Sequence, residues 1–320
     1  MAIPSWLDTV RRGLVLALLV ASPLPVLAAW TVIVPAAAGG GSDTSARVFA
    51  KYAQKKLKVP VIVQNVPGEG GYRGSRQVAE STPGQQVLLY THAGIVTNFV
   101  SGKAPYAYER FQVLGQLISD ETLALMVRGD DPIARVADLI DEARRSPATL
   151  AVATEYGAYT YFMLASLQRQ FGLSFLLADV GGDTAKLRAL LTGQVRVIPR
   201  VVGGTRAYLA DGEIRALGLV ASERPASARD VPTLQEQGVP FSFPPFPFML
   251  FAPAHLPAGA VSTLRAMVRE VTQDPGFRSE IEAASMAVRY RDPAATLSLL
   301  ADLKQRFSEL IAPATPRPAP

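Results

Sequence analysis

Apolar and polar positions form two alternating patterns along the first hundred residues. Short runs of consecutive apolar residues, typical of strands buried on both faces, occupy 30–34, 60–63 and 86–91. Apolar residues at helical spacing follow two of these runs, over 44–57 and 75–81. This alternation of strand and helix predicts an α/β fold in which helices cover a parallel sheet.

The rest of the chain continues the pattern, with a break at Gly129-Asp130-Asp131-Pro132. Further strands are predicted at 111–117, 122–128, 149–154, 174–180, 195–199 and 214–220. Further helices are predicted at 136–145, 160–171, 184–191, 205–210, 258–272, 274–285 and 293–311. We therefore expect one lobe from 29–128 together with 249–311, and a second lobe from 129–248. Ligands of open α/β sheets lie beyond the carboxyl ends of the strands, so two facing sheets predict a ligand cleft between the lobes.

The N-terminus has the three parts of a secretory signal peptide. Arg11 and Arg12 precede the apolar run 13–20, and small residues ending at Ala28 follow it. The run is too short to span a bilayer. We expect export and cleavage near Ala28, so that 1–28 is removed, and a disordered Pro/Ala-rich tail at 312–320.

Composition narrows the possible functions. The chain is 49% hydrophobic and 18% charged, which is typical of a globular protein. Its net charge of +5 is spread along the sequence without a basic stripe or a nucleic-acid motif, so no nucleic-acid partner is expected. There is no cysteine, which excludes disulfides and thiolate metal sites. The two histidines, His92 and His255, lack a carboxylate at metal-ligand spacing, and no metal is expected; His92 lies at a strand end, where it could face a ligand.

A glycine-rich stretch, Pro35 to Asp43, separates the first strand from the first helix. Gly39, Gly40 and Gly41 let the backbone turn sharply and leave its N–H groups uncovered, and the first amides of a helix are also unpaired. Ser42 and Asp43 are both good N-cap types. The stretch could cradle a small anion or the polar end of a solute, or it could be an ordinary capped turn.

Other candidate motifs argue against common enzyme classes. The run 68–74 has Arg73 where a dinucleotide fingerprint requires glycine, and 181–186 lacks the Gly-Lys-Ser/Thr of a P-loop. No Gly-x-Ser-x-Gly occurs, so a hydrolase elbow is unsupported. The aromatic-rich segment 240–248 could be an extended crossing segment packed in the core. It could instead form an apolar wall at the mouth of the cleft, or a surface that contacts a membrane partner.

Two glycine loops about two dozen residues apart, 39–43 and 65–71, carry a family resemblance. Further landmarks occur in order at 193–195, 212–217, 232–238 and 252–257. Over about 30–311 the chain resembles the Bug-type extracytoplasmic solute receptors, the substrate-binding family of tripartite tricarboxylate transporters. It departs from the family pattern at Ala36–Ala38, at Val180–Asp183 and at Arg196.

This resemblance implies a two-lobed, type II periplasmic-binding-protein fold without catalysis or cofactor. It implies a monomeric periplasmic protein that captures a small organic acid, often a carboxylate, and delivers it to a permease of one large and one small subunit. Two alternatives remain open: a ligand-binding sensory component for a membrane receptor kinase, and an exported enzyme on the same scaffold. The scarcity of histidine and the lack of an acid–base pair motif disfavour the enzyme.

The resemblance also implies which loops contact the ligand. The expected ligand-binding residues are Gly39, Gly40, Gly41, Ser42, Asp43, Gly70, Gly71, Thr91, His92, Ala93, Thr154, Gly157, Tyr159, Thr160, Gly181, Gly182 and Asp183. Glu69, Glu155 and Asp183 add negative charge to these loops, which would be unfavourable beside a buried carboxylate. Either these side chains face water, or Arg73 or Arg200 offsets them, or the ligand carries a positive group.

Overall fold

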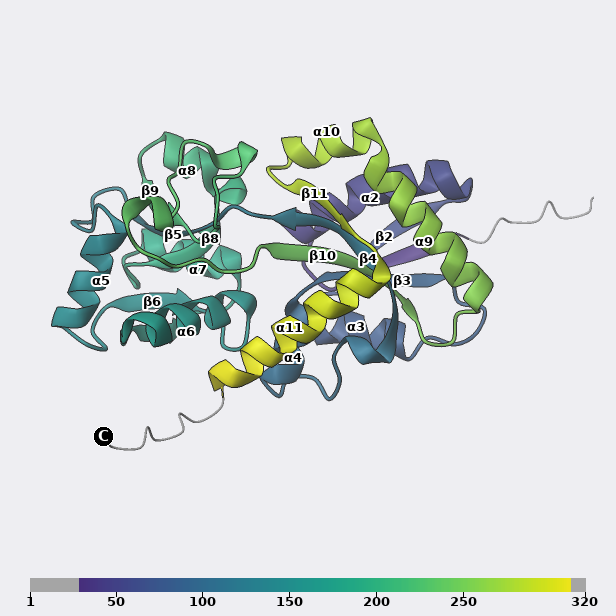
Figure 1. Ribbon diagram of the computed structural model, residues 1–320, viewed down its shortest axis with the longest axis horizontal. Coiled ribbons are helices and arrows are strands. Elements are labelled where there is room, and N and C mark those ends of the chain that lie inside the picture. The colour runs from purple at the N-terminus through teal and green to yellow at the C-terminus, as the bar shows by residue number, and fades with distance from the viewer. Residues whose placement is uncertain (1–28, 312–320) are drawn as a thin grey trace, which may run out of the picture.

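The computed structural model describes residues 29–311, which form two lobes joined side by side (Figure 1). The expected signal peptide at 1–28 and tail at 312–320 lie outside the described residues. Within 29–311, no helix combines the length and the apolar character needed to cross a membrane.

The first lobe is built on a six-stranded sheet in the order β11-β4-β10-β3-β1-β2. Its strands are β1 (Trp30–Val34), β2 (Val61–Asn65), β3 (Val87–His92), β4 (Phe111–Asp120), β10 (Phe246–Pro253) and β11 (Ala287–Arg291). Its helices are α2 (Gly41–Leu57), α3 (Tyr72–Ala79), α4 (Gly94–Val100), α9 (Ala258–Gln273), α10 (Pro275–Ala283) and α11 (Pro293–Ile311).

Both faces of this sheet are covered because successive side chains of β1 point to opposite sides. Val32 and Val34 are buried in one core with residues of α2, α9 and α10. Ile33 is buried in a second core with residues of α3, α4 and α11. The continuous apolar run at 30–34 therefore has the environment that its pattern predicts.

The second lobe contains two smaller sheets. An antiparallel sheet has the order β8-β5-β9, and β6 pairs in parallel with β7. The strands are β5 (Leu123–Arg128), β6 (Ala151–Thr154), β7 (Leu176–Asp179), β8 (Ile198–Val201) and β9 (Ile214–Leu219). The helices are α5 (Val136–Arg145), α6 (Tyr159–Phe171), α7 (Asp183–Leu191) and α8 (Arg206–Ala210).

The chain crosses between the lobes earlier than the sequence pattern suggested. Strand β4 ends in the first sheet at Asp120 and β5 begins in the second sheet at Leu123, so the crossing lies at 121–122 and not at 128. The return leads into β10, which pairs with β4 from Phe246 onward and with β3 from Phe248 onward. Because β10 is antiparallel to both neighbours, and β11 to β4, the first sheet is mixed and the expectation of mainly parallel sheets is wrong in this detail.

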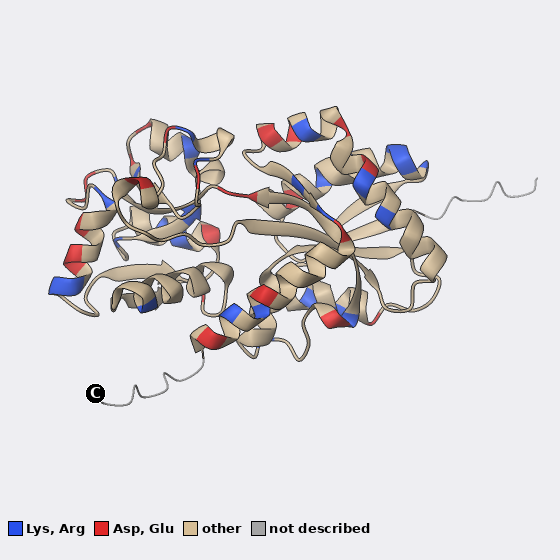
Figure 2. Ribbon diagram, in the orientation of Figure 1, with Lys and Arg blue, Asp and Glu red and all other residues tan. Residues whose placement is uncertain are grey.

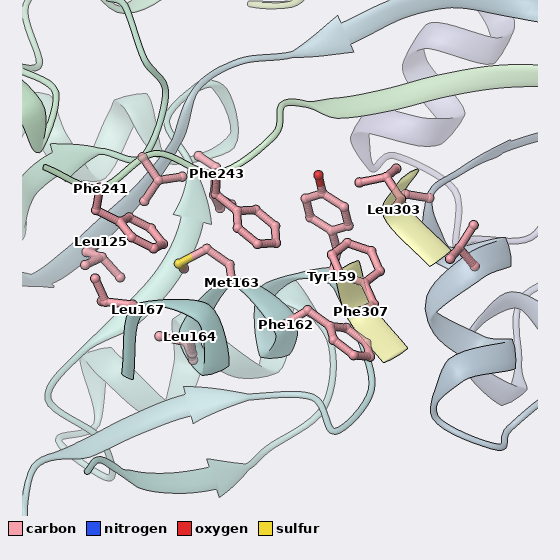
Figure 3. Close-up of a cluster of buried hydrophobic side chains, with 14 of the residues drawn as sticks. Leu125, Tyr159, Phe162, Met163, Leu164, Leu167, Phe241, Phe243, Leu303 and Phe307 are labelled. Atoms are coloured by element: carbon pink, nitrogen blue, oxygen red, sulfur yellow. The ribbon is translucent and has the colours of Figure 1, made fainter. Parts of the chain in front are cut away.

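Helix α11 extends from the first lobe to α6 of the second, and an aromatic cluster lies where they meet (Figure 3). Phe307 of α11 stacks on Phe162, with ring centroids 4.6 Å apart, and on Phe243, at 6.0 Å. Phe241, Phe243 and Phe248 are all at most 3% exposed. The aromatic-rich segment 240–248 is thus a crossing segment packed in the core, the first of its two interpretations. This shared core holds the lobes together beside the crossing strands.

Candidate functional site

The first glycine loop is fixed by its own helix. Gly39 adopts φ +84°, and its N–H donates to Asp43 Oδ2 at 2.9 Å. The other oxygen of Asp43 lies 2.9 Å from Arg47 Nε. Burial alone would raise the pKa of the Asp43 carboxyl, but hydrogen bonds from Arg47 and Gly39 outweigh burial and lower it. Asp43 is therefore an ionised group that shapes the loop, while Gly40, Gly41 and Ser42 lie at the start of α2.

The second glycine loop packs directly against the first. Gly71 has φ +98°, and a Cβ there would lie 3.1 Å from the carbonyl oxygen of Pro35. Asn65 Nδ2 donates to the carbonyl of Ala36 at 3.1 Å, and Asn98 Nδ2 to the carbonyl of Gly70 at 2.9 Å. Side chains on β2 and α4 thus hold the two loops together, as the tandem arrangement in the sequence suggested.

The end of β3 contributes the next group. Thr91 and Ala93 are 3% and 0% exposed, and α4 begins immediately afterwards. His92 Nδ1 accepts the N–H of Gly94 at 2.9 Å, and its ring lies 4.5 Å from that of Phe246. Desolvation by this apolar surrounding lowers the pKa of His92 to about 4, although Asp183 raises it somewhat. His92 is therefore neutral at pH 7.

Asp120, at the end of β4, was not recognised in the sequence. It is 5% exposed and accepts hydrogen bonds from Thr122 Oγ1 at 2.6 Å and Thr122 N at 2.8 Å. Burial raises its pKa to about 6, and the charge of Asp183 acts in the same direction. The sequence did not single out Asp120, because hydrophobic periodicity does not show where the chain passes from one lobe to the other.

The loop after β6 reaches across to the first lobe. Gly157 has φ +71°, and a Cβ there would lie 2.5 Å from the side chain of Ser101, just after α4. Lys103 Nζ donates to the carbonyl oxygen of Tyr156. Thr154, at the end of β6, is 2% exposed, and its Oγ1 has no hydrogen-bond partner among the described residues. The loop therefore contacts the first lobe, and the strand before it ends in a buried hydroxyl without a hydrogen-bond partner among the described residues.

Tyr159, expected from the resemblance to contact the ligand, lies in the core in this structure. It is 2% exposed, and its hydroxyl donates to the carbonyl oxygens of Pro244 and Pro245 at 2.9 and 3.2 Å. Its ring lies in the aromatic cluster, 4.6 Å from that of Phe246. Burial raises the pKa of its phenol well above the ordinary value. The structure assigns Tyr159 to the core, where its hydroxyl is already used.

The start of α7 carries an unexpected concentration of polar groups. Gly181 has φ +89°, Gly182 caps the helix, and the side chain of Asp183 is 55% exposed. Arg200 Nη1 donates to the carbonyl of Asp183 at 2.6 Å. Lys186, one turn into α7, has a side chain only 3% exposed, and its Nζ donates to Thr160 Oγ1 at 2.9 Å. Lys186 was assigned no role from the sequence, because its burial is not visible there.

Several contacts place the two sets of loops opposite each other. The charge of Asp183 in the second lobe acts on both His92 and Asp120 in the first. On the neighbouring edge, Ser227 Oγ of the second lobe donates to the carbonyl of Ser285 of the first lobe at 3.1 Å. The start of α7 in the second lobe thus lies near the end of β3 and the end of β4 in the first lobe.

Two cavities in the described part of the chain lie away from these loops. One, of about 400 Å³, is at the crossing and is lined by residues including Glu121, Phe243, Arg289 and Arg306. The other, of about 390 Å³, is in the second lobe near Gly212 and Asp230. In residues 29–311 there is no cluster of three or more potential metal ligands. Lysines, arginines, aspartates and glutamates are intermixed over both lobes (Figure 2).

Comparison with known proteins decides the family. A profile described as the tripartite tricarboxylate transporter family receptor matches residues 45–315. The chain belongs to this receptor family. It is 30% identical over 251 residues to the Agrobacterium vitis UPF0065 protein in the TAR-I ttuE-ttuC' intergenic region, covering 77% of this chain and 71% of that protein. It is 25% identical to the protein BugT of Bordetella pertussis, covering 88% and 87%.

Solved structures of periplasmic binding proteins share the fold. MatC from Rhodopseudomonas palustris, with bound malate, has a TM-score of 0.76 and 26% identity, covering 90% of this chain and 99% of that one. The periplasmic binding protein BugD has a TM-score of 0.75 and 24% identity, covering 88% and 96%. An R. palustris protein with adipate has a TM-score of 0.77 and 22% identity, covering 88% and 95%. The two-lobed receptor fold expected from the sequence is confirmed.

Proposed function

We propose that this receptor binds a small carboxylate between its lobes and releases it unchanged to a membrane permease of one large and one small subunit. The proposal rests on the helix starts that each lobe contributes. The first lobe supplies the N-termini of α2 and α4 and the second lobe those of α6 and α7, and the charge of Asp183 at the start of α7 acts on His92, just before α4. Unpaired amides at helix starts bind carboxylate oxygens without a full counter-charge.

Two relatives make a carboxylate the natural ligand class. The solved neighbours hold malate and adipate, which are both small dicarboxylates. We propose that the contacts come from the expected loop residues other than Tyr159, with Asp43 acting by shaping its loop. We further propose that the chain is exported through cleavage near Ala28 and acts as a periplasmic monomer.

A thermal-shift screen tests this function. The panel contains malate, the linear dicarboxylates from malonate to adipate, their half-amides, and amino acids. Ligand at a hundredfold excess over its Kd should stabilise the protein by about 2.7 kcal/mol. NMR of the ligand after long incubation should show it unchanged, as a receptor without turnover requires. If protein freed of co-purified ligand by unfolding and refolding responds to no carboxylate, the proposal fails.

A further inference from the structure

The ammonium of Lys186 lies in an electropositive position. Its side chain is 3% exposed, and it donates to Thr160 Oγ1 in the first turn of α6 at 2.9 Å. Its own helix, α7, begins only three residues earlier, at Asp183. Helix side chains lean toward the N-terminus, so the ammonium lies beside the positive ends of two helices at once. A buried cation in such a place requires a negative partner.

The described residues supply that partner incompletely. The nearest carboxylate oxygen, Asp183 Oδ1, is 3.6 Å from Lys186 Nζ, beyond hydrogen-bond distance, and its side chain is 55% exposed. An ammonium has three protons to donate, and Thr160 Oγ1 receives one of them. Arg200 adds a second cation beside Asp183, where it donates to the carbonyl of that residue and to neutral groups at Gly204 and Thr205. Asp183 alone does not balance both cations.

A further unused polar atom lies at the same edge of the second lobe. Thr154 Oγ1, at the end of β6, is buried and has no hydrogen-bond partner in the described part of the chain. Thr154 lies opposite Asp179 in the β6–β7 pair, just before the loop that leads into α7. An oxygen of a ligand could accept from both an ammonium and a hydroxyl in this region.

We infer that Lys186 is the charge-selecting residue of the second lobe and pairs with one carboxylate of the ligand. This inference rests on the proposed function and adds to it the requirement for a full negative charge at this end of the ligand. The glycine loops of the first lobe would hold the other end through neutral amides. The carboxylates of Asp183 and Glu155 lie at the same helix start and repel a ligand carboxylate, so the positive charge of Lys186 is needed there.

Lys186→Met tests the assignment, with Arg188→Met as the matched control. Both changes remove one positive charge from α7, but Arg188 is exposed while Lys186 is buried. Isothermal titration calorimetry would measure each dicarboxylate of the panel, from malonate to adipate and including malate, against its uncharged diamide, because a half-amide could still present its carboxylate to Lys186. Breaking a buried charge pair weakens binding by at least about 30-fold. Lys186→Met should therefore lose at least about 30-fold of the native preference for the dicarboxylate, while Arg188→Met keeps it.

Stability separates a ligand role from a structural one. Replacing a buried charge by an apolar side chain of similar volume is often neutral or stabilising. Ligand-free Lys186→Met should therefore unfold in urea at the same or a higher midpoint than the native protein, and Lys186→Gln should fold and show the same loss of preference. An equal preference for the dicarboxylate in the native protein and both Lys186 variants would overturn the role of Lys186 but leave the proposed function standing. Failure of the native chain to bind any carboxylate would overturn the proposed function as well.

Discussion

Removing the Asp43 carboxylate should damage ligand binding more than folding. In Asp43→Ala the Gly39 N–H loses its acceptor at 2.9 Å, and Arg47 loses its ion pair. Loss of one such hydrogen bond costs about 1 kcal/mol, and an ion pair to the half-exposed Arg47 adds less than about 1 kcal/mol. We expect a total of about 1–2 kcal/mol, or a fall in Tm of about 2–3 °C for a chain of this size.

Another aspartate of the first lobe, which caps a helix, provides the control. Asp274 accepts from Gly276 N at 2.8 Å and Phe277 N at 3.3 Å at the start of α10, away from the glycine loops. Asp274→Ala should therefore cost about the same stability, near 1 kcal/mol, without changing the ligand site. The two variants separate the stability of the fold from the shape of the loop.

Calorimetric titration and urea unfolding of both variants give the comparison. The loop of Asp43→Ala must be ordered by the ligand itself, and ordering one or two residues costs about 1–2 kcal/mol each. Its affinity for the best carboxylate of the panel should therefore fall at least about tenfold. Asp274→Ala should stay within about twofold of the native protein. Equal affinities in the two folded variants would refute the role of Asp43 in shaping the site.

Three further changes test other parts of the structure. Between pH 3.8 and about 6 the raised pKa of Asp120 makes the native protein less stable as pH rises, whereas the lowered pKa of His92 makes it more stable. Asp120→Asn should remove the first effect, so that urea unfolding shows a gain of about 2 kcal/mol from pH 4 to pH 7 relative to the native protein; parallel curves would contradict this. Gly157→Ala adds a Cβ at φ +71° that would lie 2.5 Å from the facing lobe, so ligand affinity should drop and stability should fall by about 1 kcal/mol, and unchanged affinity would argue against closure there. Tyr159→Phe leaves the carbonyl of Pro244 without its donor and should cost about 1–2 kcal/mol with unchanged affinity, whereas a clear loss of affinity would return Tyr159 to the ligand surface.

The sequence predicted most elements because their periodicity reflects local burial. Helix α5 has the predicted bounds, and α6 begins one residue earlier than expected. Helix α4 and strands β10 and β11 were missed: α4 is a seven-residue helix next to a strand, β10 begins within the aromatic-rich and proline-rich segment 240–248, and β11 has a short polar pattern. The mixed direction of the first sheet was also missed, because β10 pairs with strands more than a hundred residues away and carries no local sign of direction.

The candidate site was predictable where it depends on backbone conformation. Glycines with positive φ, such as Gly39 and Gly71, could be identified because few other residues adopt that conformation. Asp120 and Lys186 were not found, because their importance arises from burial and from charges brought together by the tertiary fold. Tyr159 was expected to contact the ligand. Only the structure shows that it is buried and that Pro244 and Pro245 accept from its hydroxyl.

The central claim is that opposed loops of the two lobes bind one carboxylate ligand between them. A crystal structure with the tightest-binding acid of the panel tests this most directly. The account predicts ligand density between the start of α2 and the start of α7, with a carboxylate oxygen within hydrogen-bond distance of Lys186 Nζ. Density in the cavity beside Arg289 and Arg306, with the glycine loops unoccupied, would contradict it.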